Sequence, residues 1–161
     1  MHARNPTFCN DQGTEGMDKC YRLVDRVHAS NLLLCTFSGV LSKANLLPLL
    51  EDLRDIERLY PQGFHRYSDL SAVEAIHLTT AEMCEITHQR RRYYRGPAVR
   101  SAMYAANPLS YGMMRMYGTM LYPSPIEVGV FYTHQEAAEW LGVPLHEVEV
   151  LKGPPGGQGM S

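Results

Sequence analysis

The stretch RYSDLSAVEAIHLTTAEM, from Arg66 to Met83, decides the fold class because it joins a strand pattern to a helix pattern. An apolar run from Phe64 to Leu70 predicts a strand, and the residues after it predict a loop. Thr79 and Glu82 then form the capping-box pattern that opens a helix, which we expect to run to about Tyr94. A strand, a loop and a capped helix in this order are the unit of a parallel α/β sheet.

Strands of the same kind lie on both sides of this unit. Two are predicted before it, from Tyr21 to Val27 and from Leu32 to Ser38, with the residues HASN between them as a tight turn. Two more are predicted after it, from Ala98 to Ala105 and from Ile126 to Phe131. Because HASN is too short for a crossover connection, we expect the first two strands to form an antiparallel hairpin.

Three further helices are expected, each opened by a capping side chain after a strand. For the first, Asn45 is the expected cap, and Pro48 takes the third helical position, where its missing N–H is not needed. The second runs from Asn107 to about Leu121, and the third is opened by a capping box at Thr133 and stopped by Gly142.

The element order is therefore ββαβαβαβα, which predicts an α/β fold: a mostly parallel five-stranded sheet with an antiparallel N-terminal hairpin, covered by helices. One domain is expected over residues 17–151, since a chain of 161 residues suffices for one core. Residues 1–16 have many turn formers and no period, and residues 152–161 are rich in Gly and Pro. A flexible leader and a flexible tail are expected there.

The composition argues against several classes of protein. With 45% hydrophobic residues, 20% charged residues and a net charge of −2, the chain lacks the basic excess typical of nucleic-acid-binding proteins. Its apolar runs are much shorter than the roughly 20 residues of a membrane-spanning helix, so no membrane insertion is expected. Cys35 lies in a predicted strand and Cys84 in a predicted helix. Both are interpreted as reduced packing thiols of a cytoplasmic protein.

Four segments carry a family resemblance: FSGVLS after the second strand, SDLSAVEAI after the third, and AANPLSYGMMRMYGTML followed by VFYTHQEAAEWL. In their order they resemble the SpoIIAA-like or STAS (sulfate-transporter and anti-sigma-antagonist) family. The resemblance covers residues 21–143 and is greatest to stand-alone bacterial SpoIIAA-like proteins of largely unassigned function. It implies a SpoIIAA-like fold.

The resemblance also directs attention to a phosphorylation site. In phosphoregulated anti-sigma antagonists an Asp-Ser-Ser-Gly motif follows the third strand, and its first serine accepts phosphate. An alignment without gaps places His77, Leu78, Thr79 and Thr80 on that motif. Leu78, at the acceptor position, has no hydroxyl, and a capping role directs the Thr79 oxygen to backbone N–H groups. We therefore expect the family's phosphorylation switch to be absent.

Polar residues follow the predicted strands and would share one rim of the sheet, where open α/β sheets bind ligands. Asp69 and Ser71 lie at the carboxyl end of the third strand, but residues of these types more often bond their own turn. The candidate rim for a ligand or partner consists of Ser42, Asp69, Ser71, Thr79, Asn107, Tyr111 and Arg115, with Asn45 and Thr133 beside them.

The predicted helix PLSYGMMRMYGTML carries an apolar stripe roughly 160° wide. Packing against the sheet explains a stripe of this width. Methionine also lines adaptable grooves, so an apolar groove or a dimer contact is the alternative. The candidate residues for that groove or contact are Met113, Met114, Met116, Tyr117 and Met120.

Other patterns give weaker signals. The segment QRRRYYRG, residues 89–96, gathers four arginines, which bind an anion or, as we prefer, compensate a helix dipole. Cys84 and His88 share a helix face, but zinc needs three or four protein ligands, so no metal and no cofactor is expected. The sequence has no nucleophile elbow and no phosphate-binding Gly-rich loop, so no catalytic residue is predicted.

Two functions fit these features. The first is a non-enzymatic regulatory or interaction domain that contacts a protein partner or a second copy of itself as a homodimer. The second is binding of a small apolar or anionic ligand, such as a lipid, between the rim and the methionine-rich helix. The resemblance favours this second function as well, because the STAS fold is often grouped with lipid-binding Sec14-like domains.

Overall fold

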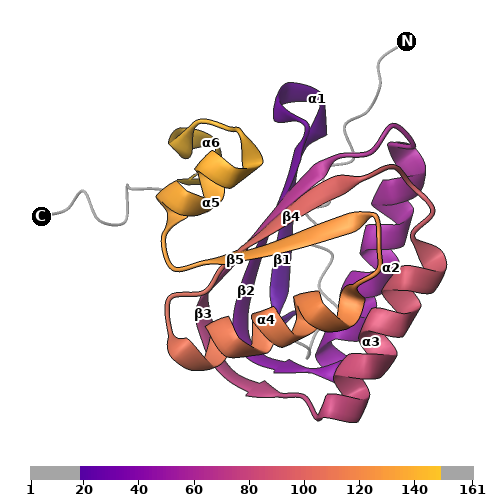
Figure 1. Cartoon of the computed structure of the whole chain (residues 1–161), viewed down its shortest axis with the longest axis vertical. Helices are drawn as coiled ribbons and strands as arrows, with labels where there is room; N and C mark the ends of the chain where they lie inside the picture. Colours follow the sequence, from indigo (N-terminus) through magenta and orange to yellow (C-terminus); the bar gives the residue numbers. More distant parts are fainter. Residues whose placement is uncertain (1–18, 150–161) are drawn as a thin grey trace, which may run out of the picture.

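The computed structural model describes residues 19–149, which form a sheet between two layers of helices (Figure 1). The strands are β1 (Tyr21–Arg26), β2 (Leu32–Ser42), β3 (His65–His77), β4 (Val99–Tyr104) and β5 (Ile126–Phe131). The helices are α1 (Val27–Ser30), α2 (Lys43–Leu59), α3 (Thr80–Tyr93), α4 (Pro108–Leu121), α5 (His134–Leu141) and α6 (Leu145–Glu149). The predicted leader and the predicted tail both lie entirely outside the described residues.

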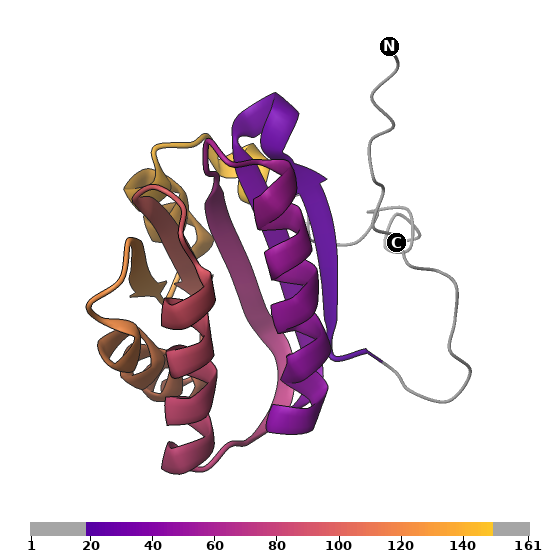
Figure 2. The same cartoon turned by 90° about the vertical axis from the view of Figure 1, so that its right-hand side faces the viewer.

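The five strands follow one another across the sheet in the order β1-β2-β3-β4-β5. β1 pairs antiparallel with β2, and the other pairs are parallel, which confirms the predicted fold class. From β2 to β5 the chain moves across the sheet in one direction, one strand at a time. Right-handed crossovers therefore place α2, α3 and α4 on the same face of the sheet. Figure 2 shows α2 and α3 side by side along that face, while α5 and α6 pack on the other.

The core is divided between the two faces by the alternation of strand side chains. Leu33 and Cys35 of β2 pack with residues of α2, α3 and α4, whereas Leu32 and Leu34 pack with α5 and α6. All four side chains are buried. A central strand covered on both faces needs such a continuous apolar run, which explains why LLLC lies in β2.

Several predicted boundaries are confirmed. The Thr79 hydroxyl accepts from the Glu82 N–H at 3.1 Å, and the Glu82 carboxylate accepts from the Thr79 N–H at 3.0 Å, which completes a capping box. Asn107 Oδ1 accepts from the Ser110 N–H at 2.8 Å and opens α4. Gly142, with φ of 74°, ends α5 in the left-handed conformation that glycine tolerates best.

The predicted cap of α2 is wrong. The helix begins at Lys43, and Ser42 is its cap, with the Ser42 hydroxyl accepting from the Asn45 N–H at 3.2 Å. The Asn45 side chain instead donates to the Val40 carbonyl at 2.9 Å. Pro48 therefore lies in the second turn, inside the helix, rather than at its third position. Ser and Asn are almost equally good caps, so their order along the chain did not distinguish them.

The predicted ends of the second and third strands are also wrong, because both strands continue. β2 extends to Ser42 and β3 to His77, and the two remain paired in parallel up to those residues. Asp69 and Ser71 thus lie in the interior of β3 rather than at its carboxyl end. The pairing of β3 with β4, in contrast, stops at Asp69, so β2 and β3 continue as a two-stranded ribbon. Gly39, with φ of 70°, lies where the register between the two strands shifts.

Smaller elements differ as well. The expected tight turn HASN belongs to the short helix α1, which ends at Asn31 in the left-handed conformation. The helix α6 was not predicted, because five residues are too few to show a helical period. Cys84 is exposed on α3, so its interpretation as a packing thiol is wrong, whereas Cys35 is buried.

Candidate functional site

A cavity of about 110 Å³ lies between the sheet and the helices α2, α3 and α4. We call it the inner cavity. Its wall is mostly apolar and includes Leu33, Leu50, Met83, Ile86, Met103 and Met114. The Cys35 thiol also lines it, and burial raises the pKa of that thiol well above its ordinary value. The thiol therefore stays protonated and acts as part of the apolar wall.

Polar residues line the inner cavity from neighbouring strands. Arg66 and Ser68 lie two residues apart on β3, and Ser101 lies opposite Arg66 on β4. Because successive strand residues alternate between faces, Arg66 and Ser68 share the face that α2, α3 and α4 cover. Arg90 reaches the same cavity from α3. All four residues are buried, which is unusual for arginine.

The two buried arginines share one carboxylate, that of Glu57 in α2. Arg90 binds it with two parallel hydrogen bonds, from Nη1 to Oε1 at 3.1 Å and from Nη2 to Oε2 at 2.7 Å. Arg66 donates to the same carboxylate through Nη2 alone. Two parallel hydrogen bonds are the strongest arrangement of a guanidinium and a carboxylate. Glu57 is therefore bound more strongly by Arg90 than by Arg66.

Arg66 is left with unused hydrogen-bond donors. Its side chain is buried, yet neither Nε nor Nη1 has a hydrogen-bond partner among residues 19–149. Its guanidinium lies over two aromatic rings, 4.7 Å from the centroid of Phe64 and 5.0 Å from that of Tyr94. The Tyr94 hydroxyl itself donates to the carbonyl of Pro97 at 2.6 Å. A buried polar group without an acceptor costs roughly 1–3 kcal/mol, and a charged group costs more.

The pKa values of the two arginines shift in opposite directions. Burial disfavours both charges, but the hydrogen bonds and the charge of Glu57 outweigh burial for Arg90 and raise its pKa. For Arg66, burial lowers the pKa, Glu57 offsets this effect in part, repulsion from Arg90 adds to it, and the interaction with the Tyr94 hydroxyl offsets burial further. Of the two arginines, Arg66 is thus the one whose charge its surroundings stabilise less.

The opposite face of β3 carries a second polar cluster. The Tyr67 hydroxyl forms a hydrogen bond with Nδ1 of His134, the first residue of α5. The His134 ring lies 3.9 Å from the Tyr104 ring between their centroids. Burial, together with the charge of Asp69, raises the pKa of Tyr67, so its hydroxyl remains protonated.

Most predicted rim residues form local hydrogen bonds. Ser42, Thr79 and Asn107 each use a side-chain oxygen to cap a helix. Asp69 is buried, and its Oδ1 accepts from the Ser71 N–H at 2.8 Å, as expected for a turn-forming pair. The strand order also does not reverse across the described strands, so they do not form the crevice at which doubly wound sheets bind ligands. A ligand or partner at this rim stays a prediction.

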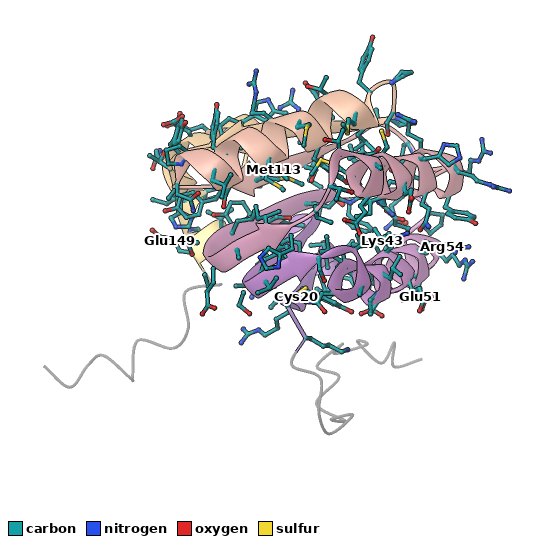
Figure 3. All side chains as sticks on the ribbon, turned by 90° about the horizontal axis from the view of Figure 1, so that it is seen from below. Cys20, Lys43, Glu51, Arg54, Met113 and Glu149 are labelled. Atoms are coloured by element: carbon teal, nitrogen blue, oxygen red, sulfur yellow. The ribbon has the colours of Figure 1, made fainter. Side chains whose placement is uncertain are left out.

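The predicted residues of α4 point in several directions. Met114 and Tyr117 line the inner cavity. Met113 lies on the side of α4 that faces the sheet (Figure 3) and packs against the core. Tyr111 stacks on Tyr132 with ring centroids 4.0 Å apart, and Arg115 is exposed. Met116 and Met120 are partly buried.

Neither a metal site nor a membrane-spanning helix is found among the described residues. Among residues 19–149, no three or more His, Cys, Asp and Glu side chains gather as metal ligands would. No helix in the same range is long and apolar enough to cross a bilayer.

Comparisons with known proteins identify the fold. No family model matches the chain, and no curated protein matches it either. Among solved structures, the chain is similar to an uncharacterized protein of the DUF3478 family from Shewanella loihica PV-4, described as having a SpoIIAA-like fold. The similarity covers 80% of this chain and 99% of that protein, with a TM-score of 0.51 and 16% identical residues. The fold is SpoIIAA-like. The fold expected from the resemblance is thereby confirmed, and at this level of identity the SpoIIAA-like protein shows the fold alone.

Sequence reasoning missed the residues at the centre of this site. Arg66 was counted as part of a strand, and Arg90 as one of four arginines near a helix end. Arg91 donates to the carbonyl of Met120 in the last turn of α4, which is a different helix from the one whose dipole it was expected to compensate. One signal was available: in the buried strand FHRYSDL the alternation places Arg66 on the same face as Phe64 and Ser68.

Proposed function

We propose that this chain binds a small amphipathic anion, with the apolar part of the ligand in the inner cavity and its acid group at Arg66. The observation that carries the proposal is the buried Arg66 guanidinium, whose Nε and Nη1 lack a partner among residues 19–149 at the wall of an apolar cavity. Two buried cations face one carboxylate there. An acid group on the ligand supplies both the missing charge and the missing acceptors.

The volume of the inner cavity limits the ligand. An engineered cavity of about 150 Å³ in another protein holds one benzene molecule, so about 110 Å³ suits an apolar group of roughly four to six carbon atoms. A long acyl chain does not fit this volume. The proposed ligands are therefore short aliphatic or aromatic acids, which is narrower than the lipid considered from the sequence.

The proposal is tested by titrating the full chain with hexanoate, followed by two-dimensional NMR. We expect saturable shifts of residues that line the inner cavity, such as Leu50 and Met103. Hexylamine and hexanol have the same number of carbon atoms but no acid group and should bind much more weakly. Arg66→Met should lower the affinity for hexanoate at least tenfold, about 1.4 kcal/mol, because it removes the partner of the acid group. Arg22→Met, an equal charge change at an exposed residue of β1, should leave the affinity unchanged.

Two results would contradict the proposal. One is the absence of saturable binding by any of the three compounds. The other is equal binding of hexanoate by the wild type and by Arg66→Met, which would show that the acid group is bound elsewhere. Native mass spectrometry of the purified protein provides an independent measurement, since a co-purifying acid would be observed directly.

The interaction function predicted from the sequence remains a second candidate. It is favoured by exposed apolar side chains at the start of α4 and directly after β5. Leu109 is 65% exposed, Tyr132 is 47% exposed, and Tyr132 stacks on Tyr111. Exposed apolar groups that lie together are typical of contact surfaces. Contact with a protein partner, a homodimer and a cytoplasmic location stay predictions.

A further inference from the structure

A second pocket, of about 260 Å³, lies at the C-terminal ends of α2 and α3. We call it the outer pocket. It is formed by the last turns of these two helices, by the loop before β3 and by the loop before β4. Arg66 lines both the inner cavity and the outer pocket. The Arg66 side chain therefore separates the mostly apolar inner cavity from the more polar outer pocket.

The outer pocket carries a surplus of positive charge. The arginines that line it are Arg54, Arg58, Arg66 and Arg95. Glu57 is the carboxylate on the lining, and it is already bound by two arginines. Asp55 pairs with Arg58 at 3.4 Å, and each helix end contributes roughly half a negative charge. Even after these deductions, and with Arg90 adjacent, the net charge around the pocket is positive.

The arginines of the outer pocket are arranged to bind acceptor oxygens. The Arg54 guanidinium lies 3.9 Å from the centroid of the Tyr93 ring, and Arg66 lies over Phe64 and Tyr94. A guanidinium that stacks on a ring by its face keeps its N–H groups free at its edge. Figure 3 shows Arg54 on α2, with its side chain pointing away from the sheet. The buried Arg66 and the more exposed Arg54 thus present donors at two depths.

We infer that the ligand's acid group is a phosphate monoester, which lies in the outer pocket while the apolar part enters the inner cavity beside Arg66. This inference rests on the proposed function and specifies the ligand's chemical class. A carboxylate has one charge and two oxygens, which suffice for Arg66 alone. A phosphate monoester carries close to two charges and three acceptor oxygens above its second pKa of about 6. It therefore matches the charge surplus and reaches several arginines at once.

The inference is tested by comparing hexyl phosphate with hexanoate in calorimetric or NMR titrations. We expect the wild type to bind hexyl phosphate at least tenfold more tightly. The double variant Arg54→Gln, Arg95→Gln should lose this preference and retain its affinity for hexanoate. The preference should also decrease as the pH falls below about 6, where the phosphate loses one charge. The matched control is Lys19→Gln, Arg22→Gln, which removes two exposed charges elsewhere and should bind both compounds as the wild type does.

Each remaining outcome has a defined meaning. Equal affinities of the wild type for the two compounds, or an equal loss of both in the Arg54 and Arg95 variant, would overturn the phosphate inference and leave the proposed function intact. Inorganic phosphate that binds as tightly as hexyl phosphate would also overturn it, because the inner cavity would then contribute nothing. If neither hexyl phosphate nor hexanoate binds, the proposed function itself fails. Thermal unfolding of each variant verifies that it is folded.

Discussion

The two faces of β3 carry two buried polar clusters that begin at adjacent residues. Tyr67 points toward α5, where its hydroxyl meets Nδ1 of His134. Arg66 points toward α2 and α3, where it shares Glu57 with Arg90 and keeps Nε and Nη1 without a partner among residues 19–149. Both side chains are almost fully buried. The two clusters therefore differ in whether the described residues provide a hydrogen-bond partner for each buried polar atom, and they do not differ in burial.

This difference separates a structural role from a functional one. A buried polar side chain whose partner comes from the protein holds two elements together, as Tyr67 holds α5 against the sheet. A buried cation with unused donors lowers the stability of the fold unless another molecule supplies the acceptors. Proteins commonly retain such groups at binding sites at the expense of stability. Three substitutions test the comparison.

The largest effect is expected for Glu57→Gln. The substitution keeps the shape of the side chain but leaves Arg66 and Arg90 as two buried cations without a negative charge. We expect the free energy of unfolding, measured in urea, to fall by roughly 3–5 kcal/mol. The control Asp55→Asn removes the carboxylate of an exposed pair with Arg58 and should cost less than about 1 kcal/mol. Similar losses for the two variants would contradict a structural role of the Glu57 charge.

An intermediate effect is expected for Tyr67→Phe. Without the hydroxyl, His134 loses its partner on β3, and we expect a loss of about 1–2 kcal/mol in the free energy of unfolding. Tyr122→Phe, which removes the hydroxyl of a side chain that is 79% exposed, is the matched control and should have no measurable effect. If Tyr67→Phe is also without effect, the cluster on this face does not contribute to stability as the comparison requires.

The smallest effect on stability is expected for Arg66→Met. Removal of Arg66 leaves Glu57 and Arg90 as a balanced pair, so no uncompensated charge remains in the core. We expect the free energy of unfolding to stay within about 1 kcal/mol of the wild type. The same variant should lose binding of hexanoate, so stability and binding would be separated at one residue. A loss as large as that of Glu57→Gln would instead show that Arg66 is required for folding.

The sequence by itself determined the features that depend on neighbouring residues. The caps at Thr79 and Asn107, the stop at Gly142 and the order of strands and helices follow from hydrogen bonds and periods within a few residues. Only the tertiary structure decided how far β3 extends, because its last residues, from Ala72 to His77, are held by pairing with β2, a strand distant in sequence. It also decided that Arg66 and Arg90 meet at one carboxylate beside a cavity. Three elements must pack together before these charges become neighbours, and no local pattern records a contact of that kind.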